Sequence, residues 1–238
     1  MTGLGTVINV AGVFAGGIIG ISFGRLIKER YQDTLMSAAG ICVLFIGVGG
    51  TLEQMLSVSQ GKLVSGGTMM MIGSFAIGAL LGEWMNIERR MEQFGEWLKI
   101  KTRSEGDTRF VDGFVTTSLT VCIGAMAVVG AIKDGIYGDY SILAAKAVLD
   151  LIIVAVMTVS MGKGCMFSAI PIALFQGSIT ILAGFMEPFL TVQALSNLSM
   201  TGSMMIFCVG VNLVWGRKIK VANLLPALVV AVAWAFII

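Results

Sequence analysis

The feature that most constrains this chain is a series of eight apolar stretches, most of them long enough to cross a lipid bilayer. A membrane-spanning helix needs about 20 consecutive apolar residues, with a range of roughly 17 to 25. We therefore predict an all-α, polytopic transmembrane helical bundle with about eight crossings, in which residues 1–238 form a single transmembrane domain. The third, seventh and eighth stretches are short enough to include a re-entrant segment. The stretches are Gly3–Phe23, Thr34–Leu52, Gly66–Leu81, Phe110–Ile132, Ser141–Met161, Phe167–Phe185, Thr201–Trp215 and Ala222–Ile238.

Composition excludes several functional classes. Of the 238 residues, 56% are hydrophobic and only 13% are charged, whereas soluble domains carry about 25% charged residues. The chain has no histidine, which removes the commonest general base and metal ligand and with it the His-dependent hydrolases and zinc proteases. Walker loops, redox Cys-x-x-Cys pairs and serine nucleophile elbows are also missing from the sequence. We expect no enzyme activity, no cofactor, no metal and no nucleic-acid partner.

Basic residues give the expected orientation, because cytoplasmic loops of membrane proteins are enriched in lysine and arginine. If the N-terminus is outside, thirteen of the 16 basic residues fall in inner loops, and only Lys62 and Lys133 fall in outer ones. Both termini are therefore predicted to face outward from a bacterial inner membrane. The inner-loop residues are Arg25, Lys28, Arg30, Arg89, Arg90, Lys99, Lys101, Arg103, Arg109, Lys163, Arg217, Lys218 and Lys220.

The second inner loop contains the one helix that is not expected to span. Apolar residues recur every three or four positions between 84 and 101, and charged residues fill the positions between them. That pattern is typical of an amphipathic helix. We interpret it first as a helix that lies in the cytoplasmic headgroup layer, and the alternative is a coupling or oligomer-contact element.

Short matches indicate an internal repeat. Gly50–Glu53 matches Gly184–Glu187, 134 positions later, and Gly67–Met70 matches Gly202–Met205, 135 positions later. Residues 1–133 and 138–238 would then be parallel repeats of four helices each, an arrangement that transporters use to form a solute site between the repeats. Chance similarity between two apolar segments is the alternative.

Two of the stretches carry small residues at every fourth position. The first has Gly12, Gly16, Gly20 and Gly24, and the third has Ser74, Gly78 and Gly82. Because lipid provides no hydrophobic force between helices, faces of small residues allow the close backbone approach that holds such helices together. The partner is either a helix of the same chain or a second copy, which leaves a homo-oligomer open.

Charged residues inside the bilayer are the strongest functional pointers, because they are costly there and need a partner or water. Lys146 and Asp150 lie one helical turn apart in the fifth stretch, and Asp150 lies roughly 12 Å from the start of that helix at about 1.5 Å per residue. Such an aspartate is protonated, paired with Lys146 or exposed to a polar cavity. The pair indicates an ion or proton path, or a structural link within the bundle.

The sixth stretch contains a second interruption. Pro171 removes a backbone hydrogen bond, and the polar side chains of Gln176 and Ser178 follow it. Non-helical backbone at membrane depth is tolerated where it faces protein or a water-filled cavity. Asn9 in the first stretch is a further polar candidate for the same path. A simple kink, with Gln176 bonded to a neighbouring helix, is the alternative.

Several of these segments together resemble a known family. They are Gly5–Asn9, Cys122–Gly130 with Asp134-Gly135, Lys146 with Leu149-Asp150, Phe175–Thr180 and Asn223–Pro226. With them the chain resembles, from end to end, the bacterial membrane family catalogued as domain of unknown function 554. One departure is Leu151, where the family usually has glycine. The resemblance implies an integral inner-membrane protein that is loosely described as a transporter, and it implies no substrate and no residue roles.

Two hypotheses from different classes follow. The first is a secondary transporter or ion-conducting protein for a small solute or ion, with Asp150 as the proton or cation site, Lys146 as its partner and the broken sixth helix along the path. The second is a membrane scaffold or sensor that acts through helix packing and through its amphipathic helix at residues 84–101. In both, the lipid bilayer is the surrounding solvent.

Overall fold

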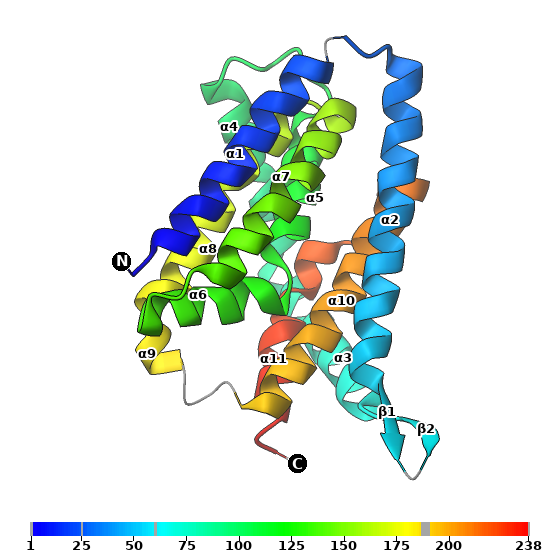
Figure 1. The fold of residues 1–238 in the computed structure, drawn as a ribbon. Helices are drawn as coiled ribbons and strands as arrows, with labels where there is room; N and C mark the ends of the chain where they lie inside the picture. Colours follow the sequence, from blue (N-terminus) through cyan, green and yellow to red (C-terminus); the bar gives the residue numbers. More distant parts are fainter. Residues whose placement is uncertain (1, 25, 60, 187–190, 238) are drawn as a thin grey trace. The chain divides into compact units, whose positions relative to one another are not determined.

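The chain is almost entirely helical in a computed structural model that describes residues 2–24, 26–59, 61–186 and 191–237 (Figure 1). The all-α fold class is therefore confirmed, while Arg25, Glu187 and Ile238 lie outside the described residues. The longer helices are α1 (Leu4–Gly24), α2 (Glu29–Met55), α3 (Thr68–Met85), α4 (Ile87–Lys101), α5 (Phe110–Cys122), α6 (Ala125–Tyr137), α7 (Ser141–Met161), α8 (Ala169–Ile181), α10 (Val192–Trp215) and α11 (Pro226–Trp234). The shorter elements are β1 (Leu56–Ser59), β2 (Lys62–Ser65), α9 (Ala183–Met186) and the 3-10 helices η1 (Lys163–Ser168) and η3 (Val221–Leu224).

Among the described residues, six helical segments are long and apolar enough to cross a membrane, or up to seven if a bent pair is counted as one span. The predicted number of eight crossings is therefore not confirmed. The last stretch forms a shorter apolar helix over Val221–Trp234. Large apolar side chains such as Phe45, Met69 and Leu80 are each about three-quarters exposed, as expected of helices whose outer faces meet lipid.

The fourth predicted stretch is not one straight helix. It divides into α5 and α6, which bend by 61° across a short break. Gly124 lies in this break with a backbone φ of 142°, a conformation that glycine adopts more readily than other residues. The predicted stretch Phe110–Ile132 is therefore a bent pair of helices and not one continuous helix, and α6 runs on to Tyr137.

Three other predicted boundaries also change. The seventh stretch is not short, because α10 begins at Val192 and includes polar residues such as Asn197, whose side chain donates to the carbonyl oxygen of Ala231 at 3.1 Å. The amphipathic helix begins at Ile87, because Asn86 ends α3 in the left-handed conformation with φ of 52°. Residues 56–65, which lie between the second and third predicted stretches, form the antiparallel hairpin β1–β2.

The chain divides into two compact units, each with segments from both halves of the sequence. Unit 1 comprises Met1–Ala39, Arg89–Cys122 and Met126–Glu187. Unit 2 comprises Gly40–Glu88, Ile123–Ala125 and Pro188–Ile238. The predicted repeat of residues 1–133 and 138–238 stays a prediction.

Helices α1 and α7 pack side by side in unit 1 and run in the same direction (Figure 1). The glycine face of α1 makes this close approach possible, because the glycines have no side chain to separate the two backbones. In each close pair the α7 residue lies 135 positions after its α1 partner. These pairs are Gly12 with Ala147, Gly16 with Leu151, Gly20 with Ala155 and Gly24 with Val159.

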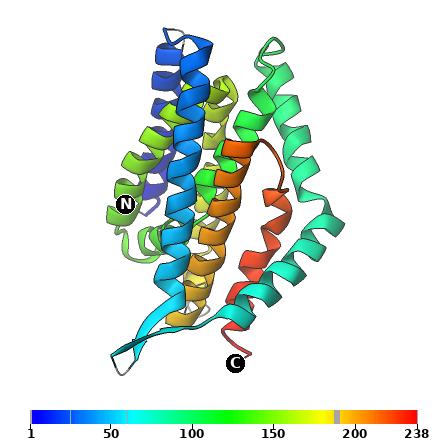
Figure 2. The same ribbon diagram turned by 90° about the vertical axis from the view of Figure 1, so that its right-hand side faces the viewer.

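Unit 2 uses small residues in the same way. Figure 2 shows α11 beside α3, and Gly78 of α3 faces the backbone of Ala227 in α11. The C-terminal half of α2 lies against α10, where Gly47 approaches Phe207 and Gly210 approaches Leu44. The glycine-rich faces of α1 and α3 are thus covered by helices of the same chain.

Candidate functional site

The most unusual chemical feature of unit 1 is a buried ion pair on α7. The side chains of Lys146 and Asp150 are 8% and 6% exposed, and the Lys146 ammonium donates to the Asp150 carboxylate. The same ammonium donates to the backbone carbonyl oxygen of Val121 at 2.8 Å. The sequence leaves three states open for Asp150: protonated, paired with Lys146 or exposed to a polar cavity. In the structure Asp150 is paired with Lys146.

The Val121 carbonyl is available because α5 ends one residue later, at Cys122. The last four carbonyl groups of a helix have no partner within that helix, and the C-terminus carries a partial negative charge that attracts cations. The break between α5 and α6 therefore creates an acceptor at the place where Lys146 needs one. The ammonium lies between a carboxylate and a free helix end.

Two carboxamide side chains lie beside the pair and are completely buried. Asn9 of α1 donates its Nδ2 to Oε1 of Gln176 on α8 at 3.2 Å. The same Asn9 side chain also lies close to the Asp150 carboxylate. Asn9 Oδ1 and Gln176 Nε2 have no hydrogen-bond partner among the described residues. Buried polar atoms without partners are rare in native proteins and commonly indicate a bound water, an ion or a functional role.

Polar contacts continue from this layer toward the N-terminal end of α1. The hydroxyl groups of Thr6 and Thr180 lie 3.0 Å apart. Asp134 of α6 is fully buried and accepts hydrogen bonds from the N–H groups of Gly5 and Thr6 at 3.0 and 3.3 Å. These N–H groups belong to the first turn of α1, where a helix favours negative charge.

Toward the opposite end of unit 1 an apolar layer follows the ion pair. Val13, Val154 and Ile172 are each 0% exposed and form one cluster with Val121 and Ala169. They lie about one helical turn from Asn9, Asp150 and Gln176 respectively, on the same three helices. Among the described residues, the contacts of Thr6, Thr180 and Asp134 lie on one side of the ion pair, and this apolar cluster lies on its other side.

Of the six residues predicted for the path, four come together in this cluster: Asn9, Lys146, Asp150 and Gln176. Ser178 does not, because it is exposed and donates to the carbonyl oxygen of Phe175 in its own helix. Pro171 lies in the first turn of α8, which runs without a break to Ile181. The prediction that Pro171 interrupts the helix is therefore wrong, because the backbone changes from 3-10 to α-helix before the proline.

Sequence reasoning missed Asp134 as a buried residue. It was expected beyond the outer end of a straight fourth span, whereas the bend at Gly124 turns α6 and brings Asp134 to the start of α1. The available signal was the position of Asp134-Gly135 within the segment that carries the family resemblance.

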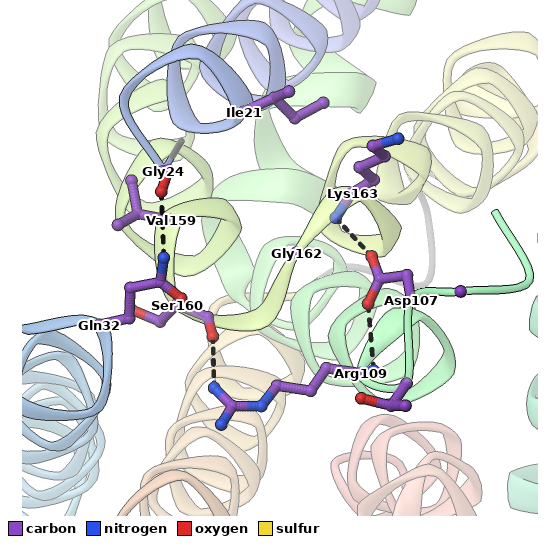
Figure 3. Close-up of a pocket in the computed structure, with 11 residues that line it drawn as sticks. Ile21, Gly24, Gln32, Asp107, Arg109, Val159, Ser160, Gly162 and Lys163 are labelled. Atoms are coloured by element: carbon purple, nitrogen blue, oxygen red, sulfur yellow. Dashed lines mark hydrogen bonds between the residues drawn. The ribbon is translucent and has the colours of Figure 1, made fainter. Parts of the chain in front are cut away.

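A cavity of about 490 Å³, lined by both apolar and charged residues, lies at the end of unit 1 where α1 and α7 finish. Figure 3 shows Arg109 bonded to the carbonyl oxygen of Ser160, and the Asp107 carboxylate accepting from the N–H groups of Lys163 and Arg109. Arg109 also pairs with Asp33 at 3.4 Å. Ser160 follows Asp150 by ten residues on α7, which corresponds to about 15 Å along a helix.

Unit 2 contains a separate charged network where α3 meets α4. Glu88 is 6% exposed and pairs with Arg217 at 2.6 Å. Its second carboxylate oxygen accepts from the N–H of Ala222 at 2.8 Å, and its own N–H donates to Asn223 at 2.7 Å. This network holds η3 and the chain before it against the end of α3, a structural role. Among the described residues, no three His, Cys, Asp or Glu side chains form a metal-binding group.

Relatives match this chain along nearly its whole length. The family model "Protein of unknown function (DUF554)" matches residues 4–236. "Uncharacterized membrane protein YdfK" of Bacillus subtilis is 30% identical over 234 residues, which cover 98% of this chain and 96% of the relative. "Uncharacterized protein YqgA" of Escherichia coli is 25% identical over 232 residues, which cover 96% and 94%. No solved structure matches.

The family match agrees with the resemblance that the sequence segments indicated. A helical chain with several apolar helices long enough to span a bilayer, and with a relative named a membrane protein, is a membrane protein. The chain belongs to the DUF554 family of proteins of unknown function.

Proposed function

We propose that this chain translocates an ion or a small solute across the membrane, as a secondary transporter or as an ion-conducting protein. Asp150 is the proton or cation site, and Lys146 neutralises it while the site is closed. The observation that carries the proposal is the buried Lys146–Asp150 pair, set against a helix break and two buried carboxamide atoms without partners. Ionisable groups at membrane depth are costly, and they commonly mark ion or proton pathways.

The layers of unit 1 support an access path from one side. Thr6, Thr180 and the carboxamides of Asn9 and Gln176 supply polar contacts as far as the ion pair. The apolar cluster around Val154 closes the other side. A transporter needs such one-sided closure, because its site opens to the two sides of the membrane in turn.

The test measures flux through the purified protein reconstituted into lipid vesicles that contain a fluorescent indicator of the ion under test. Gradients of protons, sodium, potassium and chloride are imposed one at a time. The wild type should move at least one of these ions, and Asp150→Asn should abolish the movement because it removes the charged site. Asp139→Asn is the matched control, because Asp139 lies outside the helices and its carboxylate accepts from the nearby N–H of Ser141.

A second variant keeps the test decisive if Asp150→Asn fails to fold with Lys146 left unpaired. The double variant Lys146→Gln/Asp150→Asn contains neither buried charge, so it should fold, and it should not transport. The proposal is wrong if the wild type moves none of the tested ions, or if a folded variant without Asp150 moves them at the wild-type rate.

The buried pair also favours a second function, a membrane scaffold or sensor. In that case the pair only fixes α7 against α5, and α4 supplies a contact surface, since Trp97 and Ile100 are 52% and 65% exposed. If the protein is a scaffold, wild-type vesicles should show no flux, and a partner should bind the wild type but not the Trp97→Ala variant. The flux measurement therefore separates the two functions.

We further propose that the protein resides in the bacterial inner membrane with both termini outside. The proposal rests on the distribution of lysine and arginine among the loops. In a cysteine-free variant, a membrane-impermeant maleimide should label Lys62→Cys from outside intact spheroplasts. It should label Lys101→Cys only after permeabilisation, and the reverse pattern would overturn the orientation.

A further inference from the structure

We propose that the ion path of unit 1 continues beyond the buried pair to the cavity beside Arg109 and Lys163. An apolar layer formed by Val13, Val154 and Ile172 is the gate that interrupts this path. We call these three residues the gate layer. The inference rests on the proposed function and extends it to residues on the other side of the pair.

The first support is the order of side chains along α7. Asp150, Val154 and Thr158 follow one another at intervals of four residues, so they lie on one face of the helix. Each of the three is 5% exposed or less. At about 1.5 Å per residue, Val154 lies roughly 6 Å beyond Asp150 and Thr158 roughly 12 Å beyond it. On this helix the apolar barrier is therefore a single side chain between two polar ones.

Two neighbouring segments have the same order. Against the direction of the chain, Gln176 is followed by Ile172 and then by Ser168, again at intervals of four residues. On α5, Val121 of the apolar cluster lies four residues after Thr117. Ser168 and Thr117 are both 0% exposed. Three segments therefore place a buried hydroxyl group about one turn beyond the apolar cluster.

These hydroxyl groups lie together. The Cys165 thiol of η1 lies close to both Thr117 and Thr158, and the Ser168 hydroxyl donates to the carbonyl oxygen of Cys165 at 2.7 Å. The Thr158 hydroxyl has no hydrogen-bond partner among the described residues. The Thr117 hydroxyl donates to the sulfur of Met157 at 3.7 Å, and a thioether is a weak acceptor. Buried polar groups without a good partner commonly bind water.

The cavity begins directly beyond this second polar layer of Thr117, Thr158, Cys165 and Ser168. Ser160 and Gly162 line the cavity and follow Thr158 by two and four residues, and Lys163, which also lines it, precedes Cys165 by two. Figure 3 shows Asp107, Arg109 and Lys163 around it. On α7 the gate layer is therefore the interruption between Asp150 and the polar groups that lead to the cavity.

An apolar layer of this thickness is a barrier that a small change can open. An ion that enters it must leave its water and finds no oxygen in exchange, which is costly. Ion channels use such constrictions as gates, because water leaves a narrow apolar segment. One hydroxyl group placed in the gate layer should therefore open the path between the two polar layers.

The experiment uses two native thiols on opposite sides of the gate layer. Cys122 lies close to Lys146 and Asp150, and Cys165 lies in the second polar layer. Full-length protein in sealed membrane vesicles is exposed to silver nitrate from the cavity side, because Ag⁺ is a small cation that binds thiols. Thiols that have not reacted are labelled with a maleimide after denaturation and located by mass spectrometry. A separate Lys163→Cys sample, labelled with an impermeant maleimide, identifies the side that the cavity faces.

In the wild type, Ag⁺ should protect Cys165 well before Cys122, because the gate layer lies between them. Val154→Thr keeps the shape of the side chain and should speed the protection of Cys122 about tenfold or more, since a hydroxyl oxygen can bond to a passing cation or water and a methyl group cannot. Val13→Thr should have the same effect from α1. Val209→Thr is the matched control, at a valine of unit 2 that is 1% exposed, and should keep the wild-type rates.

The inference is overturned if Ag⁺ from the cavity side does not reach Cys165 before Cys122 in the wild type. It is also overturned if folded Val154→Thr and Val13→Thr leave the protection of Cys122 unchanged. If one variant does not fold, the other decides, and if neither folds, the order of the two thiols in the wild type decides alone.

Thiol protection and flux separate this inference from the proposed function. The expected order of the two thiols without flux of any tested ion would keep the gated path and remove the transport proposal. Flux that depends on Asp150, together with equal protection of Cys122 and Cys165 from the cavity side, would keep transport and remove this inference.

Discussion

The close contact of α1 with α7 predicts that adding one methyl group at Gly20 destabilises the protein. A Cβ atom at Gly20 would lie 2.6 Å from the Ala155 carbonyl oxygen and 2.5 Å from the Cβ atom of Thr158. Neither neighbour is the end of a flexible side chain, so α1 and α7 must move apart. The perturbation to test is therefore Gly20→Ala.

The magnitude follows from two opposing effects. Replacing glycine by alanine within a helix stabilises the folded protein by roughly 0.5–1 kcal/mol when there is room for the added methyl group. Overpacking of a close-packed site costs about 1–3 kcal/mol. With two rigid neighbours at Gly20 the second effect dominates, and we expect a net loss of about 1–2 kcal/mol. For a chain of this size that lowers the melting temperature by about 2–8 °C.

Gly177→Ala is the matched control for this prediction. Gly177 is also a helical glycine of unit 1, but among the described residues no atom outside its own turns of helix lies within 4 Å of the place where its Cβ would be. It should therefore gain helix propensity alone and melt about 1–4 °C higher than the wild type. The assay is thermal unfolding of both variants in one detergent, followed by circular dichroism. A Gly20→Ala variant as stable as Gly177→Ala would refute the packing argument.

Three further predictions concern other polar contacts. Asp134→Ala should lower the free energy of unfolding by about 1–3 kcal/mol, measured by melting in detergent, because it leaves two buried N–H groups of α1 without an acceptor. Asp134→Asn should lower that free energy by less. Glu88→Gln should speed amide hydrogen exchange at Ala222, whose N–H donates to that carboxylate, and unchanged exchange would contradict the role given to it. Hydrogen bonds from Ser141 lower the pKa of Asp139. The ionised Asp139 carboxylate therefore stabilises the folded protein above its unfolded pKa of about 4, and this stabilisation is lost as the pH falls through the lower folded pKa. Asp139→Asn should accordingly flatten the acid side of a plot of melting temperature against pH.

The sequence predicted much of the candidate site because the relevant spacing is local. Lys146 and Asp150 are four residues apart, so any helix places them on one face. Asn9 and Gln176 were recognised as polar residues within apolar stretches. None of these patterns states which helices are neighbours, and the contact of Asn9 with Gln176 joins residues 167 positions apart.

The errors arose where tertiary contacts replaced local preference. Apolarity predicts a continuous fourth span, but hydropathy does not register the bend that Gly124 permits. The predicted seventh stretch begins at Thr201 and omits the polar start of α10, where the Asn197 side chain donates to the carbonyl oxygen of Ala231. Ser178 was included because serine is polar, although serine in a helix commonly bonds its own backbone.

The sequence by itself determined that this is a helical membrane protein with an ion pair within one of its helices. Those properties follow from hydrophobicity and from helix periodicity, which are local. Only the tertiary structure decided that the pair meets the free end of α5, that Asn9 and Gln176 lie beside it, and that the glycines of α1 pack on α7. The physical reason is that a buried charge takes its properties from the groups brought to it by distant segments, and a single sequence does not state that pairing.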